Sequence, residues 1–296
     1  MKRILLLSGK GGTGKTTVSS ALIRLSQAKA VADCDVDAPN LHLVLQEKAQ
    51  VCAQTCAQVS EFFGGEKAAV DPTLCTGCGR CEQLCRFDAI HLVENTAVVN
   101  LYSCEGCGVC SHVCPAGAVR LLPDVAGKKE LYTGDRVFST ATLKMGRGNS
   151  GKLVTEVKKA MLKAAPPCEL AIVDGSPGIG CPVIASVNGM DLVLVVAEPS
   201  GSGISDLKRL CATAATLQVQ LAVCVNKYDV SPQHTERIET FCRQQGIAFV
   251  GKIPFDPMAV RAVNEGTTVV DIDCPAGRAV REIFAKLTAL LTERSI

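Results

Sequence analysis

The chain of 296 residues opens with a short apolar run, followed by a glycine-rich loop and a segment with helical spacing. The loop reads GKGGTGKT over residues 9–16 and matches the pattern G-x-x-x-x-G-K-[S/T]. Between a strand and a helix, such a loop directs backbone N–H groups and a helix N-terminus at one anion. We expect Lys15 to reach the β- and γ-phosphates of a nucleotide and the Thr16 hydroxyl to bind Mg²⁺. The other residues expected to line the phosphates are Gly11, Gly12, Thr13, Gly14 and Thr17.

Short apolar runs alternate with helical stretches through much of the chain. The runs are Ile4–Leu7, Ala30–Ala32, Leu170–Val173, Leu192–Ala197, Leu221–Val225 and Ile247–Ile253. The helical stretches are Thr16–Gln27, Ser202–Leu217, Pro232–Gln245 and Ala276–Thr292. This alternation predicts an α/β fold with a doubly wound, mostly parallel sheet. Several runs end in polar or acidic residues, and ligands of such sheets bind at the carboxyl ends of the strands.

Eight of the seventeen cysteines form an internal repeat with a period of 29 residues. Each half has the spacing C-x₂-C-x₂-C-x₃-C, which is typical of bacterial two-cluster ferredoxins. In this arrangement three closely spaced thiolates wrap one cubane and the fourth ligand comes from the other half. The predicted ligands are Cys75, Cys78, Cys81 and Cys114 for one [4Fe-4S] cluster, and Cys104, Cys107, Cys110 and Cys85 for the other. A pair of structural zinc sites is the alternative, and the crossed repeat disfavours it.

The cysteine repeat interrupts the alternation of strands and helices. We therefore expect a small α+β domain of the bacterial ferredoxin type at residues 66–124, inserted into a P-loop domain made of residues 1–65 and 125–296. Leu131–Thr142 is expected to be a strand or hairpin that returns the chain to the larger domain. The spacing Cys52-x₃-Cys56 weakly suggests a further metal site, whereas cysteines in apolar contexts are expected to be core or surface thiols. These are Cys168, Cys211, Cys224, Cys242 and Cys274.

The additional lysine of the loop, Lys10, is not needed by an ordinary phosphate loop. With it, KGGTGKT resembles the deviant Walker A motif of the MinD/ParA/Mrp branch of P-loop ATPases. This resemblance implies that ATP is bound and hydrolysed to ADP, and that a homodimer closes through the nucleotide sites, with Lys10 reaching the partner's nucleotide. It also implies that Asp35 polarises the attacking water, with Asp37 as the alternative, and that Asp174 holds Mg²⁺ through water.

The identity of the base is predicted from a second pair of segments. Asn226-Lys227-Tyr228-Asp229 reads as N-K-x-D, which selects guanine in other P-loop proteins. In the MinD-like branch the equivalent of Asn226 accompanies adenine, together with a loop that resembles residues 253–256. The resemblance therefore implies ATP rather than GTP, with Asn226, Pro254 and Asp256 near the base.

Cys181 lies seven residues after Asp174. In the nitrogenase iron protein, which belongs to the same superfamily, a cysteine at a similar interval holds a cluster shared across a dimer. One thiolate per chain is too few for such a cluster. The simpler interpretation is a small buried thiol before Pro182, and the alternative is a soft metal ion gripped by two Cys181 thiolates of a closed dimer.

Composition narrows the range of partners. Lys and Arg exceed Asp and Glu by only two, aromatic residues make up 4%, and Trp is absent, so we expect no nucleic-acid partner. No apolar run reaches the length of a spanning helix, and the amphipathic C-terminal stretch is expected to pack on the sheet. Without a secretory signal, the cysteines are expected to be reduced and to serve metals in a cytoplasmic protein without stable membrane association.

Combining the two motifs, the chain resembles MinD-superfamily ATPases with an inserted ferredoxin domain, including ATPases linked to the orange protein complex. This resemblance implies an ATPase that couples dimer closure to electron transfer, or to assembly of a metal–sulfur cofactor on a partner. An iron–sulfur cluster carrier of the Mrp type is the alternative, although the C-terminal C-x-x-C pair of such carriers is absent. A positioning ATPase of the MinD or ParA type is disfavoured, since it has no use for redox clusters.

Overall fold

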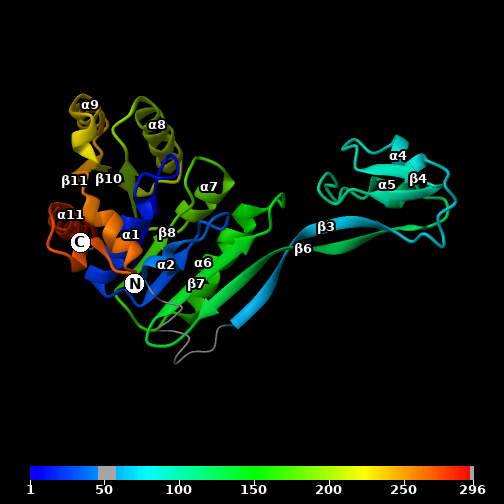
Figure 1. Ribbon diagram of the computed structural model, residues 1–296, viewed down its shortest axis with the longest axis horizontal. Coiled ribbons are helices and arrows are strands. Elements are labelled where there is room, and N and C mark those ends of the chain that lie inside the picture. The colour runs from blue at the N-terminus through cyan, green and yellow to red at the C-terminus, as the bar shows by residue number, and fades with distance from the viewer. Residues whose placement is uncertain (46–57, 294–296) are drawn as a thin grey trace. The chain divides into compact units, whose positions relative to one another are not determined.

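Nine strands pair side by side in the structure, a computed structural model that describes residues 1–45 and 58–293 (Figure 1). They are β1 (Lys2–Leu7), β2 (Ala30–Asp33), β3 (Gln58–Val70), β6 (Val119–Tyr132), β7 (Val137–Leu143), β8 (Leu170–Asp174), β9 (Leu192–Ala197), β10 (Gln220–Asn226) and β11 (Ala248–Ile253). Their order across the sheet is β11-β10-β9-β1-β8-β2-β7-β6-β3. From β11 to β7 every pairing is parallel, which confirms the predicted mostly parallel α/β sheet.

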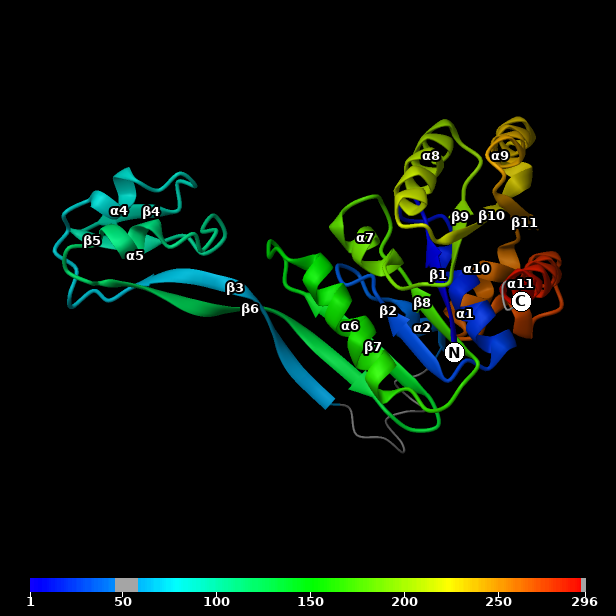
Figure 2. The same ribbon diagram turned by 180° about the vertical axis from the view of Figure 1, so that it is seen from behind.

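Helices cover both faces of this sheet (Figure 2). One layer packs α1 against α11, α2 and the η2 turn, and the other packs α6, α7, α8 and α9 in sequence. The bounds are α1 (Lys15–Ser26), α2 (Leu41–Leu45), α6 (Ser150–Ala164), α7 (Cys181–Val187), α8 (Gly201–Thr216), η1 (Tyr228–Val230), α9 (Pro232–Gln244), α10 (Pro257–Asn264), η2 (Val269–Asp271) and α11 (Pro275–Glu293). A sheet covered on both faces explains why its central strands are apolar throughout.

The C-terminal helix packs on the sheet, as its sequence predicted. Val280, Ile283 and Leu287 on α11 are buried in the same core as Ile4 of β1 and Val250 of β11. Burying one such side chain stabilises the fold by about 1.5–3 kcal/mol. The apolar face of α11 is therefore used within the fold.

Four helices of the larger unit (α2, α6, α7 and α10) and the full length of strands β3 and β6 were not predicted. Helix α6 carries Leu153, Val157 and Met161 at helical spacing, all of them buried. Helix α7 has only seven residues, too few for a periodic signal. The segment predicted as a strand or hairpin at 131–142 is the end of β6 and most of β7, two neighbouring strands joined by residues 133–136.

The described residues divide into two compact units. The phosphate-loop unit comprises residues 1–60, 129–142 and 150–296, of which the structure describes those given above. The cysteine-rich unit comprises residues 61–128 and 143–149. It therefore extends beyond the expected insert at 66–124 and includes the segment between β7 and α6.

The cysteine-rich unit contains a small antiparallel sheet and two short helices. Its elements are α4 (Arg80–Gln83), β4 (Ile90–Val93), β5 (Thr96–Val99) and α5 (Val109–Val113). Its buried core comprises Ala68, Cys81, Ala89, Ile90, Ala97, Cys104, Cys110 and Val119. Cysteine side chains are thus part of what holds this unit together.

Candidate nucleotide and cluster sites

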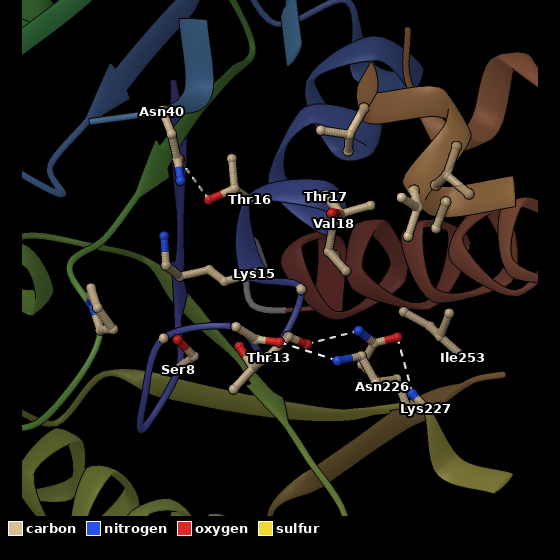
Figure 3. A pocket seen from close by; sticks show the side chains of 18 of the residues that line it. Ser8, Thr13, Lys15, Thr16, Thr17, Val18, Asn40, Asn226, Lys227 and Ile253 are labelled. Carbon is tan, nitrogen blue, oxygen red and sulfur yellow. Dashed lines mark hydrogen bonds between the residues drawn. The ribbon is translucent and has the colours of Figure 1, made fainter. Parts of the chain in front are cut away.

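The phosphate loop curls at the carboxyl end of β1, and α1 begins at Lys15 (Figure 3). Gly14 has φ +89°, a left-handed conformation that favours glycine, and a Cβ there would lie 2.2 Å from Nδ2 of Asn226. Asn226 at the end of β10 donates from Nδ2 to the Thr13 carbonyl over 2.7 Å. Lys227 donates to the Gly12 carbonyl over 3.2 Å. Asn226, which was predicted near the base, and its neighbour Lys227 therefore hold the phosphate loop at Gly12 and Thr13.

Asp174, at the end of β8, contacts the functional side chains at the end of the phosphate loop. Its Oδ1 lies 2.9 Å from Nζ of Lys15, and its Oδ2 accepts a 3.0 Å hydrogen bond from the Thr16 hydroxyl. Ser19 on α1 also donates to Oδ1. Burial lowers the pKa of Lys15, but the Asp174 carboxylate outweighs it and the pKa is raised overall. The two groups predicted to bind Mg²⁺ are thus in direct contact, although they are 158 residues apart in the sequence.

Three aspartates lie at and just after the end of β2. Asp33 has a structural role, whereas Asp35 and Asp37 line a cavity. Asp33 is buried and accepts hydrogen bonds from the backbone N–H groups of Asp35, Asn40 and Leu41. Burial, together with the negative charge of Asp174, raises the pKa of Asp33 to about 7 and that of Asp35 to about 6. Asp35 and Asp37 both line the cavity described next, so the choice between them stays a prediction.

A cavity of about 660 Å³ opens over the phosphate loop, a volume suited to a small-molecule ligand. One end is polar, with Lys15, Thr16 and Asp35, and the other is apolar. The apolar end is lined by Ile253, Pro254, Phe255, Ala259, Val260, Val263, Val269, Ala276 and Val280. This gradient suits a nucleotide, with its phosphates on the loop and its base among aliphatic side chains.

Two acidic residues near the apolar end are engaged in structural hydrogen bonds. Asp256 caps α10 by accepting from the Met258 N–H, and it also accepts from the Ala276 N–H. Asp229, the last residue of N-K-x-D, accepts a 2.7 Å hydrogen bond from the Phe255 N–H. Pro254 and Asp256 line the cavity as predicted, but the Asp256 carboxylate is used to shape it.

Lys10 lies apart from the residues that line this cavity. Its Nζ forms a 2.6 Å ion pair with Oε2 of Glu198 at the end of β9 and lies 3.5 Å from the Ser202 hydroxyl. Glu198 also lies 3.8 Å from Nζ of Lys227. Glu198 was not predicted as a site residue, although its place at the carboxyl end of a buried strand was visible in the sequence.

The cysteines of the second half of the repeat line a cavity of their own. It is bounded by Cys104, Cys107, Cys110 and Cys85, the four residues predicted for one cluster. Three residues of the other predicted set, Cys75, Cys81 and Cys114, also lie near one another. Burial raises the pKa of the Cys81 thiol, and the nearby Cys114 and Cys75 raise it further. Each group therefore includes one thiol from the other half of the repeat.

The two halves repeat their geometry as well as their spacing. Gly77 and Gly106 have φ of +68° and +64°, and a Cβ at either would lie within 2.5 Å of a backbone oxygen, that of Asn95 or Glu66. The fourth cysteine of each half accepts a backbone N–H from the residue four positions later. These bonds run from Ala89 to Cys85 over 3.4 Å and from Ala118 to Cys114 over 3.3 Å. N–H groups directed at sulfur stabilise thiolate ligands.

Among residues 1–45 and 58–293, no three His, Cys, Asp or Glu side chains converge as one metal ion would require. Four thiols of the repeat, those of Cys85, Cys104, Cys107 and Cys110, line one small cavity instead. The chemistry of the donors, thiols beside glycine turns and backbone N–H groups directed at sulfur, is that of iron–sulfur cluster ligands. Cys52 and Cys56 lie outside the described residues.

The remaining described cysteines are mostly core thiols. Cys211, Cys224, Cys242 and Cys274 are buried, and Cys168 is half-buried, as the sequence predicted. Cys181 differs from its simpler interpretation: it is exposed at the first residue of α7. The turn that precedes the helix lifts it out of the core, and this feature has no signal in the local sequence.

A phosphate loop at the carboxyl end of a parallel sheet, below a cavity of nucleotide size, defines a P-loop nucleotide-binding protein. The family model of the CobQ/CobB/MinD/ParA nucleotide binding domain matches residues 4–269. The chain therefore belongs to this family.

Relatives and solved structures agree with this assignment. The chain is 31% identical to the uncharacterized protein MJ0578 of Methanocaldococcus jannaschii, covering 96% of each chain. It is 24% identical to the iron–sulfur cluster carrier protein of Pyrococcus horikoshii, over 98% of this chain and 87% of that protein. The septum site-determining protein MinD with Mg-ADP from Pyrococcus horikoshii has the same fold, with a TM-score of 0.57, 16% identity, and coverage of 98% and 96%.

Within the described residues, none of the helices combines the length and the apolar character that a membrane span requires.

Proposed function

We propose that this protein is an ATP-hydrolysing iron–sulfur protein that couples nucleotide-driven closure of a homodimer to electron transfer, or to metal–sulfur cofactor assembly on a partner. The observation that carries the proposal is the grouping of seven of the eight repeat cysteines into two crossed sets, in a chain whose other unit has a nucleotide cavity. A nucleotide-binding protein that also holds two redox clusters can couple the nucleotide that is bound to the redox state of the clusters.

The nucleotide site supports ATP as substrate. Lys15 would exchange the Asp174 carboxylate for the β- and γ-phosphates, since both are anions within its reach. Thr16 and Asp174, already in contact, would then hold Mg²⁺, which neutralises charge on the phosphates. Asp229, whose Oδ1 accepts from the Phe255 N–H, is not among the residues that line the cavity, so the carboxylate used in guanine selection lies outside it.

Hydrolysis would use Asp35 to orient the attacking water. Its carboxyl lines the polar end of the cavity, and a pKa of about 6 leaves it mainly ionised at neutral pH, as a proton acceptor requires. Lys10 is held by Glu198 and exposed enough to leave it, since surface ion pairs contribute only about 0–1 kcal/mol. Released from Glu198, Lys10 would reach the nucleotide of a second copy.

The clusters would be held by Cys75, Cys78, Cys81 and Cys114, and by Cys104, Cys107, Cys110 and Cys85. When bound, they supply one-electron redox chemistry at low potential. The chain contributes the thiolates, the glycine turns and the N–H groups of Ala89 and Ala118 that lie against sulfur. Cys78 and Cys107 are exposed, so these ligands place an edge of each cluster near solvent and a redox partner.

Anaerobic purification tests the proposal. The protein should carry about eight irons per chain, two cubanes' worth, and should hydrolyse ATP in preference to GTP. Zinc in place of iron, or equal affinity for GTP and ATP, would contradict it.

A cluster carrier is the second candidate, because several relatives bear that name. A carrier gives up its cluster readily, whereas a redox cluster with four protein thiolates resists a chelator. Transfer of iron to an apo-acceptor protein, measured with and without ATP, separates the two functions. Release within minutes would favour the carrier.

A further inference from the structure

Residues 143–149 connect β7 to α6, yet they fold as part of the cysteine-rich unit. We call this segment the linker. Its principal attachment is Arg147. The guanidinium donates to the Leu101 carbonyl over 2.7 Å, lies 3.2 Å from Oδ1 of Asp124, and stacks 5.5 Å from the centroid of the Tyr102 ring. Only 12% of the Arg147 side chain and 11% of the Asp124 side chain are exposed, so this is a nearly buried ion pair.

Three further contacts hold the linker to the same unit. Asn149 donates from Nδ2 to the Gly64 carbonyl on β3, and the Lys144 N–H donates to the Ala126 carbonyl on β6 over 2.8 Å. Gly146 lies so close to Tyr102 that a Cβ there would be 3.2 Å from the ring. The linker is thus fastened to both long strands and to the turn at residues 101–103, which leads directly into the cluster ligand Cys104.

The other end of the linker continues without a break into α6. Within the phosphate-loop unit, α6 is joined to α7 by a buried lysine. Nζ of Lys158 donates to the carbonyls of Ala185, Ser186 and Asn188 over 2.8, 2.6 and 2.6 Å. These carbonyls lie at the C-terminal end of α7, where backbone oxygens lack helical partners. At the opposite end, a Cβ on Gly151 would lie 3.3 Å from the Cys181 carbonyl.

Helix α7 in turn follows the loop that begins at Asp174, the residue in contact with Lys15 and Thr16. That loop runs from Asp174 to Gly180, and the Gly178 N–H now donates to the Ser8 carbonyl over 2.9 Å. Asp174 contacts Lys15 and Thr16, and bound nucleotide with Mg²⁺ would take over these two side chains. Nucleotide binding therefore changes the partners of the segment directly before α7.

We propose that Arg147 and Lys158 make the linker and α6 a coupling element between the nucleotide site and the cluster held through Cys104. The inference rests on the proposed function, since it requires both ligands. Through its hydrogen bonds Lys158 makes α6 move together with α7. Arg147 makes the turn before Cys104 move together with the linker. Breaking a nearly buried ion pair such as Arg147–Asp124 costs much free energy. The linker should therefore switch between discrete positions and not deform gradually.

Linkage provides the test. If nucleotide state alters the cluster, cluster redox state alters nucleotide affinity by the same factor. A tenfold ratio of affinities between oxidised and reduced protein corresponds to about 59 mV in a one-electron midpoint potential. We therefore expect the dissociation constant of a non-hydrolysable ATP analogue to differ between the two redox states by about 5-fold or more.

Arg147→Ala should bring this ratio to about one while the iron content and the affinity of the oxidised protein stay at wild-type levels. Met145→Ala is the matched control, because Met145 lies in the same linker and is 94% exposed. It should keep the wild-type ratio. An Arg147→Ala protein with the full ratio would overturn the coupling role, as would a wild-type ratio of one.

Two further measurements keep the test decisive. If the Arg147→Ala protein loses iron, hydrogen exchange on the wild-type protein replaces the affinity measurement. The amides of residues 144–149 should then change protection when the ATP analogue binds. Unchanged protection refutes the inference. Lys158→Met should also reduce the ratio, because it removes three hydrogen bonds at similar volume. A wild-type protein that binds no iron or no ATP contradicts the proposed function instead, so the two failures are distinguishable.

Discussion

The two units are held together by different means. The phosphate-loop unit has an extended aliphatic core that includes Ile4, Leu22, Ile172 and Leu194, and its functional side chains satisfy one another without a ligand. The cysteine-rich unit has a small core in which Cys81, Cys104 and Cys110 are members. From this difference we predict that the first unit folds on apolar burial alone, whereas the second also needs the clusters that we propose its thiolates bind.

Removing iron should have the largest effect, because it should unfold one unit and leave the other folded. We expect the cysteine-rich unit to lose its structure in the apo protein, since small metal domains gain folding free energy from metal binding. The phosphate-loop unit should remain folded. Hydrogen exchange followed by residue should show lost protection in β4 and β5 and retained protection in β1 and β8. Equal protection of both units without iron would show that the small core suffices.

Cys114→Ala sharpens the comparison within the repeat. It should remove the cluster served by Cys75, Cys78 and Cys81, and halve the iron from about eight to about four per chain. Cys168→Ala is the control, since Cys168 is a half-buried thiol in the other unit. Loss of the cluster served by Cys104 and Cys107, detected by its spectroscopic signature, would contradict the crossed assignment.

Lys15 and Lys10 allow the same contrast inside the phosphate-loop unit. Lys15→Ala should weaken ATP binding roughly 10- to 150-fold, as expected for loss of a charge-assisted contact of about 1.5–3 kcal/mol. Lys10→Ala should leave binding by the monomer within about 2-fold while abolishing hydrolysis, because Lys10 lies apart from the cavity. Calorimetry and phosphate release measure the two effects. Normal hydrolysis by Lys10→Ala would exclude a role across a dimer.

The smallest expected effect is the pH dependence of the nucleotide-free protein. Burial raises the pKa of Asp35 from 3.8 to about 6, so the folded state binds more protons than the unfolded state between these values. The stability from this group is complete below about pH 4 and is lost as pH rises through about 6, a change on the order of 2 kcal/mol. Asp35→Asn should flatten this decline in denaturant titrations. An unchanged profile would assign the decline to other groups.

The sequence alone determined the parts that depend on local spacing. The phosphate loop lies between a strand and a helix because GKGGTGKT follows an apolar run, and Cys85 lies with Cys104, Cys107 and Cys110, as two identical spacings 29 residues apart predict. Strands β9 and β11 were predicted within one residue, since β9 is a continuous apolar run and β11 is an apolar run interrupted only by Gly251 and Lys252. These signals are short-range, and the tertiary structure leaves them intact.

Only the tertiary structure decided which distant side chains meet. Lys15 pairs with Asp174 because β1 and β8 are neighbours in the sheet, and Lys10 pairs with Glu198 because β9 lies on the other side of β1. Arg147 gave no signal in the sequence, since its partners lie 46 and 23 positions away on separate segments. Ion pairs of this kind depend on strand order and chain path, which no local pattern encodes.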